Sequence, residues 1–277
     1  MLLITHDLEQ ALVVADRVVV FYEGRSIEEA RVEDFARAET LKQPYTRALW
    51  RAMPRHGFVC PGENDGTGEE RLRKEPVSEL EARNLTFRYK NRQRDILKDV
   101  CLKVKSGEIV GLTAPSGYGK TTLCKLLAGY EKPREGEILL DEKPLKPQKG
   151  SHPVQMIWQQ GILAVDPRMR MKEILQEGGK VQGRILDGLG IQQDWMNRFP
   201  SELSGGELQR FCIARALGPA TRFLLADEIT AMLDLISQCR IWRFLIREAR
   251  ERNLGILVVS HNTDLLERIC DRIEHWD

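Results

Sequence analysis

The chain contains the segment Thr113-Ala114-Pro115-Ser116-Gly117-Tyr118-Gly119-Lys120-Thr121-Thr122, in which small and turn-forming residues separate two apolar runs. Residues 108–112 come before it and predict a buried strand, and residues 122–129 follow with helical spacing and a terminal glycine. In a strand–turn–helix unit of this kind, backbone N–H groups and the helix N-terminus form a concavity that binds phosphate. The segment therefore predicts a phosphate-binding P-loop.

Individual positions in this loop have expected roles. In the pattern G-x-x-x-x-G-K-[ST], the lysine reaches the β- and γ-phosphates and the hydroxyl residue holds Mg²⁺. Lys120 and Thr121 occupy these two positions, whereas Ala114 replaces the first glycine. An ordinary glycine-rich turn between a strand and a helix remains the alternative for this segment alone. The other loop positions expected to contact a nucleotide are Ser116, Gly117, Tyr118, Gly119 and Thr122.

The composition argues against several classes of protein. The 277 residues include 42 Lys and Arg and 41 Asp and Glu, and the resulting net charge of +1 predicts neither a nucleic-acid footprint nor an acidic tail. No run approaches the ~18 apolar residues that span a bilayer, and His6 and Asp7 interrupt the apolar start, so no signal peptide is expected. The six cysteines show no C-x-x-C spacing. We therefore expect a soluble chain in a reducing compartment, with any membrane role arising through a partner.

Strand-like and helix-like segments alternate in two parts, residues 1–57 and 79–277, joined by a turn-rich and charged linker at residues 58–78. This alternation predicts an α/β fold with a mostly parallel core sheet. The expected strands are residues 81–89, 97–104, 108–112, 136–141, 154–158, 223–226 and 255–259, with a hairpin at 18–28. The expected helices are residues 8–15, 32–37, 44–53, 122–129, 171–193, 204–217 and 236–252.

The chain repeats itself once. The motif around His6, with Asp16-Arg17 behind it, recurs 255 positions later around His261, with Asp271-Arg272 behind it. That offset is about the length of one domain and a linker, so residues 1–57 are expected to be the C-terminal remnant of a first domain of the same kind. A chance match of two strand–His–helix units is the alternative.

Residues 223–228 form an apolar run that ends in two carboxylates, Asp227 and Glu228. In P-loop ATPases the first carboxylate at such a position contributes to the Mg²⁺ shell and the second polarises the attacking water. An acidic pair after a strand is more often a feature of a helix N-terminus. Its place 107 residues after Lys120, within an alternating α/β pattern, favours the catalytic interpretation.

The most specific signal is Leu203-Ser204-Gly205-Gly206-Glu207-Leu208-Gln209-Arg210. A capping box would explain Ser204 and Glu207, but it does not explain the paired glycines or the Gln-Arg that follows. Here the chain resembles the ABC ATPases, of which this is the signature motif. The resemblance covers residues 79–277. It implies a P-loop fold of the ABC type, with an antiparallel β subdomain and a helical subdomain beside the parallel core.

Other positions acquire expected roles only through this resemblance. It implies that Tyr89 stacks on adenine, that Gln159 senses Mg²⁺ and the membrane partner, and that His261 contacts the γ-phosphate. Asp234 matches the D-loop, although Ala231 stands where the family usually has serine. Taken alone, each of these residues has an ordinary structural explanation. The residues that the resemblance assigns to catalysis are Glu228, His261 and Gln159, and those assigned to Mg²⁺ are Thr121, Gln159 and Asp227.

The resemblance also implies partners. In the family, Ser204-Gly205-Gly206 closes over the ATP of an opposing subunit, so a second ATPase domain or subunit is expected. The string Pro44-Tyr45-Thr46-Arg47-Ala48-Leu49 is similar to the tail of dipeptide, oligopeptide and nickel importer ATPases. This similarity implies an ATP- and Mg²⁺-dependent motor on the cytoplasmic face of the cell membrane, bound to transmembrane permease subunits and not to nucleic acid.

Two other functions remain open on the sequence. Ala114 and Tyr118 favour a degenerate domain that binds nucleotide without efficient hydrolysis. A non-transport ABC ATPase is a further alternative, although long coiled-coil or zinc-bearing insertions typical of that class do not occur in the sequence. Residues 1–57 are expected to be catalytically idle. We also hypothesise that residues 17–30 serve the second domain as substitute edge strands, since their apolar run needs burial.

Overall fold

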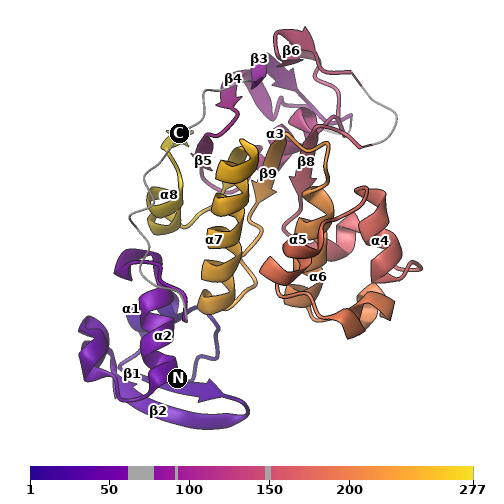
Figure 1. Ribbon diagram of the computed structural model, residues 1–277. Helices are drawn as coiled ribbons and strands as arrows, with labels where there is room; N and C mark the ends of the chain where they lie inside the picture. The colour runs from indigo at the N-terminus through magenta and orange to yellow at the C-terminus, as the bar shows by residue number, and fades with distance from the viewer. Residues whose placement is uncertain (62–77, 91–92, 147–150, 277) are drawn as a thin grey trace. The chain divides into compact units, whose positions relative to one another are not determined.

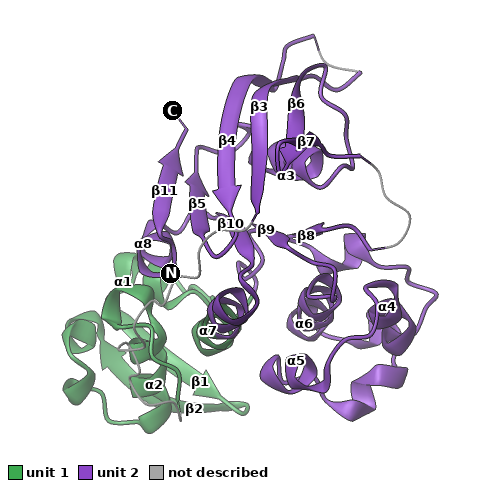
Figure 2. Cartoon of the chain, turned by 45° about the horizontal axis from the view of Figure 1, so that its top comes forward, with its two compact units in different colours: residues 1–71, 233–243 green, residues 72–232, 244–277 purple. Residues whose placement is uncertain are grey.

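The computed structural model describes residues 1–61, 78–90, 93–146 and 151–276. Most of the linker expected at residues 58–78 therefore lies outside the described residues. The chain divides into two compact units, one of residues 1–71 and 233–243 and the other of residues 72–232 and 244–277 (Figure 2). Each unit is described by itself below.

The larger unit contains a five-stranded sheet whose neighbouring strands all run parallel (Figure 1). Four of these strands are buried along nearly their whole length, because the sheet of an α/β fold is covered on both faces. The sequence prediction of a mostly parallel core is confirmed. In spatial order the strands are β11 (Arg272–His275), β5 (Ile109–Thr113), β10 (Gly255–Val259), β9 (Phe223–Asp227) and β8 (Val154–Ile157).

A second, antiparallel sheet belongs to the same unit. Its strands in spatial order are β4 (Leu97–Lys105), β3 (Glu79–Phe87), β6 (Glu135–Leu140) and β7 (Lys143–Pro144). Apolar side chains of both sheets and of α3 (Lys120–Leu127) form one buried cluster that includes Leu85, Leu112 and Leu123. The P-loop helix is thus packed on both sheets through this core.

The remaining helices of this unit cover the parallel sheet or form a separate helical group (Figure 2). They are α4 (Met171–Glu177), α5 (Gly183–Gly188), α6 (Gly205–Ala216), α8 (Thr263–Ile269) and the second half of α7 (Leu235–Arg252), with 3-10 turns η4 (Gly161–Ala164), η5 (Gln193–Asn197) and η6 (Pro200–Glu202). The helical span expected at residues 171–193 is in fact two helices, because Gly178 and Gly179 are poor helix formers and follow α4 directly.

α5 is attached to α7 by both charge and close packing. The Arg184 guanidinium contacts the carboxylates of Glu248, which is fully buried, and Glu251. One turn further along α5, a Cβ atom on Gly188 would lie 2.3 Å from the ring of Phe244. The ring therefore occupies the space that a side chain at position 188 would need.

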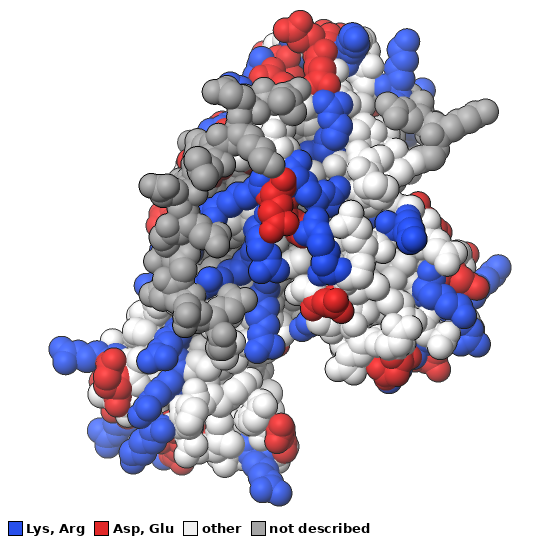
Figure 3. All heavy atoms as spheres, viewed as in Figure 1, with Lys and Arg blue, Asp and Glu red and all other residues white. Residues whose placement is uncertain are grey.

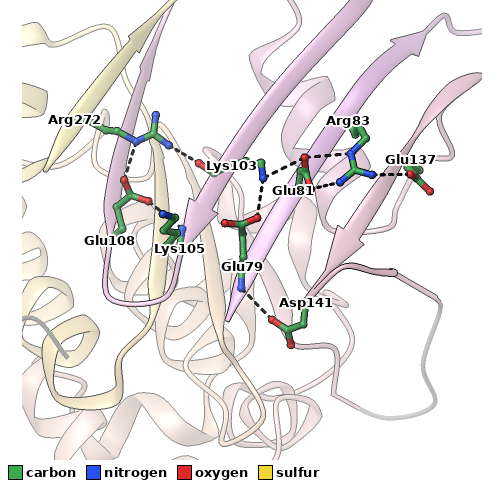
Figure 4. A network of polar contacts seen from close by, with 9 residues as sticks. All are labelled: Glu79, Glu81, Arg83, Lys103, Lys105, Glu108, Glu137, Asp141 and Arg272. Atoms are coloured by element: carbon green, nitrogen blue, oxygen red, sulfur yellow. Dashed lines mark hydrogen bonds and ion pairs between the residues drawn. The ribbon is translucent and has the colours of Figure 1, made fainter. Parts of the chain in front are cut away.

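A network of ion pairs and hydrogen bonds crosses the antiparallel sheet and reaches the parallel one (Figure 4). Lys103 Nζ lies 3.0 Å from Glu79 Oε1 and 3.4 Å from Glu81 Oε1. Arg272 of β11 donates to the Glu108 carboxylate at 2.7 Å and to the Lys103 carbonyl. Because these side chains are partly exposed, each pair contributes at most about 1 kcal/mol, and the network chiefly fixes β11 against β4.

The smaller unit contains α1 (Leu8–Val14), the hairpin β1 (Arg17–Tyr22) and β2 (Arg25–Arg31), and α2 (Pro44–Ala52), with 3-10 turns η1 (Val32–Ala36), η2 (Ala38–Thr40) and η3 (Pro54–His56). The predicted hairpin is confirmed. The segment expected as a helix at residues 32–37 is a 3-10 turn. β1 and β2 pair with each other as a two-stranded sheet. The hypothesis that residues 17–30 serve the second domain as substitute edge strands stays a prediction.

The structure explains locally why α2 begins where it does. Pro44 occupies the first turn, where a missing N–H costs nothing. Just before it, the Glu28 carboxylate accepts hydrogen bonds from the backbone N–H groups of Lys42 at 2.6 Å and Gln43 at 3.0 Å. These contacts tie the hairpin to the entry of α2.

Among the helices of the described residues, none combines the length and the apolar character required to cross a bilayer. Lys and Arg side chains lie among Asp and Glu on the face shown in Figure 3.

Phe223→Ala should lower the free energy of unfolding by about 3–5 kcal/mol, because the ring is fully buried in β9 and its removal leaves a cavity in the core. Chemical denaturation measures this change. Phe21→Ala is the matched control, since Phe21 is 67% exposed and its removal should change stability by less than about 0.5 kcal/mol. Equal effects of the two substitutions would contradict the placement of Phe223 in the core.

Candidate functional site

The P-loop follows the carboxyl end of β5, and the strand register brings two other loops to the same edge of the sheet. Val259 of β10 pairs with both Leu112 of β5 and Asp227 of β9. Loops after neighbouring parallel strands meet at one edge, where ligands of open α/β sheets bind. The P-loop, the acidic pair and His261 therefore start from adjacent points.

Gly119 explains the tight path of the loop into α3. It is the N-cap residue with φ +86°, and a Cβ atom there would lie 2.8 Å from the side chains of both Ile96 and Leu97. Only glycine fits this position without strain. Ser116, Gly117 and Tyr118 form the exposed rim of the loop, with Tyr118 46% exposed.

Lys120 is buried at the centre of the site. Its ammonium donates to the carbonyls of Ala114 at 2.6 Å and Pro115 at 3.1 Å, and lies 3.3 Å from His261 Nε2. Burial lowers the pKa of Lys120, although the carboxylates of Glu228 and Asp227 act in the opposite direction. Ala114 uses its backbone carbonyl here, so a methyl group in place of the first glycine leaves this contact intact.

The two carboxylates at the end of β9 have different surroundings. Asp227 is 5% exposed, and burial raises its pKa despite a hydrogen bond with the side chain of Thr121. Glu228 carries a left-handed backbone with φ +50°, which is uncommon for a residue with a side chain and marks candidate functional positions. Asp227 therefore points into the fold beside the P-loop helix, whereas Glu228 turns out of the strand.

Glu228 contacts two of the other expected site residues. Gln159 Nε2 donates to Glu228 Oε2 at 2.7 Å, and His261 Nε2 lies 3.0 Å from Glu228 Oε1. Since His261 also contacts Lys120, one chain of polar contacts runs from Gln159 through Glu228 and His261 to the P-loop lysine. The structure thus brings together residues that are up to 141 positions apart in the sequence.

Tyr89 lies beside the P-loop helix. Its hydroxyl is 3.4 Å from the Thr122 hydroxyl, and its ring meets Phe87 edge-on with the ring centroids 4.8 Å apart. The side chain is half-buried. A fixed aromatic ring at the rim of a phosphate loop can stack on a planar base.

Other expected site residues make their contacts elsewhere in the fold. Ser204 and Glu207 form a capping box at the start of α6, with hydrogen bonds of 3.3 Å and 2.7 Å, and Ser204 and Gly205 are exposed. Gly206 lies in the first turn of α6. Asp234 belongs to the smaller unit, where its carboxylate accepts from the Ser237 N–H at 3.0 Å and so begins α7.

Sequence reasoning treated Gln209 only as part of the signature motif. In the structure this residue is 4% exposed and donates to the Trp158 carbonyl at 2.9 Å, next to Gln159. The signal available in the sequence was a polar residue at a position where helical spacing places an apolar one.

Three features define a P-loop ATPase domain. They are a glycine-rich loop between β5 and α3, a buried lysine within that loop, and an acidic pair at the end of a neighbouring parallel strand. Comparison with known proteins narrows the class. A family model described as ABC transporter matches residues 97–231. The chain is 34% identical over 209 residues to the nickel import ATP-binding protein NikE of Escherichia coli K12, covering 69% of this chain and 78% of that protein.

Two further comparisons identify the same class of protein. The glutathione import ATP-binding protein GsiA of Salmonella choleraesuis is 28% identical over 312 aligned residues, which cover 98% of this chain and 50% of that protein. The dimeric ATP-binding cassette MJ0796, solved in a post-hydrolysis state with ADP and Pi, is 27% identical with a TM-score of 0.63, covering 72% of this chain and 94% of that one. The chain belongs to the ABC transporter family of ATP-binding proteins, and it is an ATPase.

Proposed function

We propose that this chain is the ATP-hydrolysing subunit that powers an importer of peptides or nickel. The observation that carries the proposal is the continuous set of contacts from Gln159 through Glu228 and His261 to Lys120. The names of two relatives support the direction of transport and the class of cargo. NikE is a nickel import ATP-binding protein, and GsiA is a glutathione import ATP-binding protein, where glutathione is a tripeptide.

Phosphoryl transfer requires positioning and charge compensation more than covalent chemistry. The Lys120 ammonium compensates charge on the β- and γ-phosphates, and the backbone N–H groups of residues 116–122 hold the phosphates in place. Glu228 orients or deprotonates the attacking water. His261 lies within contact distance of Glu228 and of Lys120, so it can link the carboxylate to the γ-phosphate. Tyr89 stacks on the adenine.

The residues at the end of β9 fit a magnesium ion. Mg²⁺ prefers oxygen ligands such as carboxylates and hydroxyl groups, and Asp227 and Thr121 supply them side by side. Burial disfavours the charged form of Asp227 and so raises its pKa, and a bound cation would compensate the charge of the carboxylate. Gln159 reaches the same region from the loop after β8. When bound, the ion supplies charge neutralisation at the phosphates.

The exposed signature residues suit a composite site between two ATPase domains. ATP-binding cassettes dimerise, as the MJ0796 structure illustrates. Ser204 and Gly205 are exposed at the N-terminus of α6, a helix end that favours anions. We infer that Ser204, Gly205 and Gly206, with Asp234, serve the ATP of a partner domain. Transmembrane permease subunits then hold the assembly on the cytoplasmic face of the membrane.

The domain organisation we propose is a remnant of a first ABC domain at residues 1–57, a linker at 58–78 and an ABC ATPase nucleotide-binding domain at 79–277. The alignment with GsiA supports it, because it extends over 98% of this chain and therefore into the first part. The repeat also supports it, because Arg17 begins β1 as Arg272 begins β11.

Uptake measurements in the native host test the function. Cells in which this chain carries Glu228→Gln should lose uptake of nickel or of a labelled dipeptide at limiting concentration. Glu267→Gln, at an exposed position of α8, is the matched control and should leave uptake unchanged. Loss of ATPase activity in the Glu228→Gln chain with normal uptake of both substrates would contradict the importer assignment. Normal ATPase activity in that variant would contradict the assigned role of Glu228.

A further inference from the structure

The signature helix α6 holds the loop after β8 through a regular series of hydrogen bonds. Gln209 Nε2 donates to the Trp158 carbonyl at 2.9 Å, Cys212 Sγ to the Gly161 carbonyl at 3.6 Å, and Arg215 Nη2 to the Ala164 carbonyl at 2.7 Å. Donors and acceptors both recur every third residue. A single face of α6 is therefore matched to the backbone of residues 158–164, which includes the 3-10 turn η4.

The two segments also approach too closely for a side chain at position 161. A Cβ atom on Gly161 would lie 3.0 Å from both Cys212 Sγ and Gln209 Oε1. Gln209 and Cys212 are 4% and 3% exposed, so water competes little for these bonds. The Gly161 carbonyl is buried, and a buried carbonyl without its donor would carry an unfavourable free energy.

Trp158 lies where this series meets the P-loop helix. Its ring packs under the Lys125 ammonium, 5.1 Å from the ring centroid, and against Tyr130 at a centroid separation of 5.6 Å. Its carbonyl is held by Gln209. The backbone from which the next residue, Gln159, reaches the Glu228 carboxylate is thus fixed from two sides.

We propose that Gln209 is a positioning residue for ATP hydrolysis, because its hydrogen bond to the Trp158 carbonyl sets the point from which Gln159 contacts Glu228. The inference rests on the proposed function, since it takes Glu228 as the group that acts on water. It assigns to a buried residue of the signature helix a role toward the nucleotide of its own chain. The exposed Ser204 and Gly205 of the same helix point to the partner's nucleotide instead.

Gln209→Met tests this role in the purified full chain, because methionine keeps the volume of glutamine and removes the donor. We expect kcat for ATP to fall about 3- to 10-fold, the effect of one neutral hydrogen bond, while KM changes less than twofold. The double variant with Gln159→Ala should be no slower than Gln159→Ala alone, because Gln209 acts through Gln159. Multiplicative losses in the double variant would overturn the proposal.

The control is Gln155→Met in β8, which also removes a glutamine donor from a backbone carbonyl, that of His152, away from the loop. It should leave kcat unchanged.

If Gln209→Met does not fold, Gln209→Glu replaces it. The carboxyl group of the glutamate can donate to the Trp158 carbonyl only when it is protonated, so kcat relative to wild type should rise as pH falls. A flat ratio would contradict the proposal. An inactive Glu228→Gln with a fully active Gln209→Met would refute this inference alone, whereas an active Glu228→Gln would refute the proposed function as well.

Discussion

Glu228→Gln should retain ATP binding and lose about 10²- to 10⁴-fold in turnover, the range expected when a general base is removed. The glutamine amide is isosteric with the carboxylate, so it can still accept from Gln159 and occupy the left-handed backbone at this position. It cannot take a proton from water. Steady-state ATPase assays measure the loss, and nucleotide-binding titration checks that affinity for ATP stays within about threefold of wild type.

The same assay on Glu267→Gln provides the control, because this exposed carboxylate lies on α8 and takes no part in the described contacts of the site. Turnover in that variant should equal that of the wild-type chain. Wild-type turnover in Glu228→Gln would remove Glu228 from the role of base. Loss of ATP binding in that variant would assign the carboxylate to binding instead of to chemistry.

Lys120→Met should weaken ATP binding about 10- to 100-fold, since hydrogen bonds from a charged donor contribute about 1.5–3 kcal/mol each. The free energy of unfolding should change little by comparison, because the removal of a charge that burial disfavours offsets the loss of the hydrogen bonds to the Ala114 and Pro115 carbonyls. Burial already lowers the pKa of Lys120, which means that the folded protein disfavours the charged ammonium while no phosphate is bound. The variant therefore separates nucleotide binding from folding.

Calorimetric titration with ATP and thermal unfolding without nucleotide measure the two effects. Lys143→Met is the control, because Lys143 is exposed on the short strand β7. Unchanged ATP affinity in Lys120→Met would contradict the assignment of this loop as the nucleotide site. A large loss of stability would show instead that the lysine is a structural cation.

Local sequence patterns were sufficient to predict much of the fold. The strands that contain Val110, Leu225 and Leu257 were predicted because parallel strands buried on both faces read as continuous apolar runs. The break after α4 was missed because helical periodicity continues on both sides of it.

The candidate site, too, could be predicted from the sequence only in part. Lys120 and Glu228 stand in patterns whose chemistry follows from the residues themselves, and the fold brings them to one edge of the sheet. The bond between Gln209 and Trp158 joins residues 51 positions apart. Spacing along one helix gives no information about which loop carbonyl will face it, so this contact required the tertiary structure.

The close approach of Gly188 and Phe244 restricts which residues these two positions can accept as the sequence evolves. Gly188 is the last residue of α5, and the phenyl ring of Phe244 fills the space that a side chain there would occupy. A larger residue at 188 becomes acceptable only after a smaller one appears at 244. Among descendants of this chain, the two positions should therefore change as a pair, and their joint variation would report the α5–α7 contact without any further structure determination.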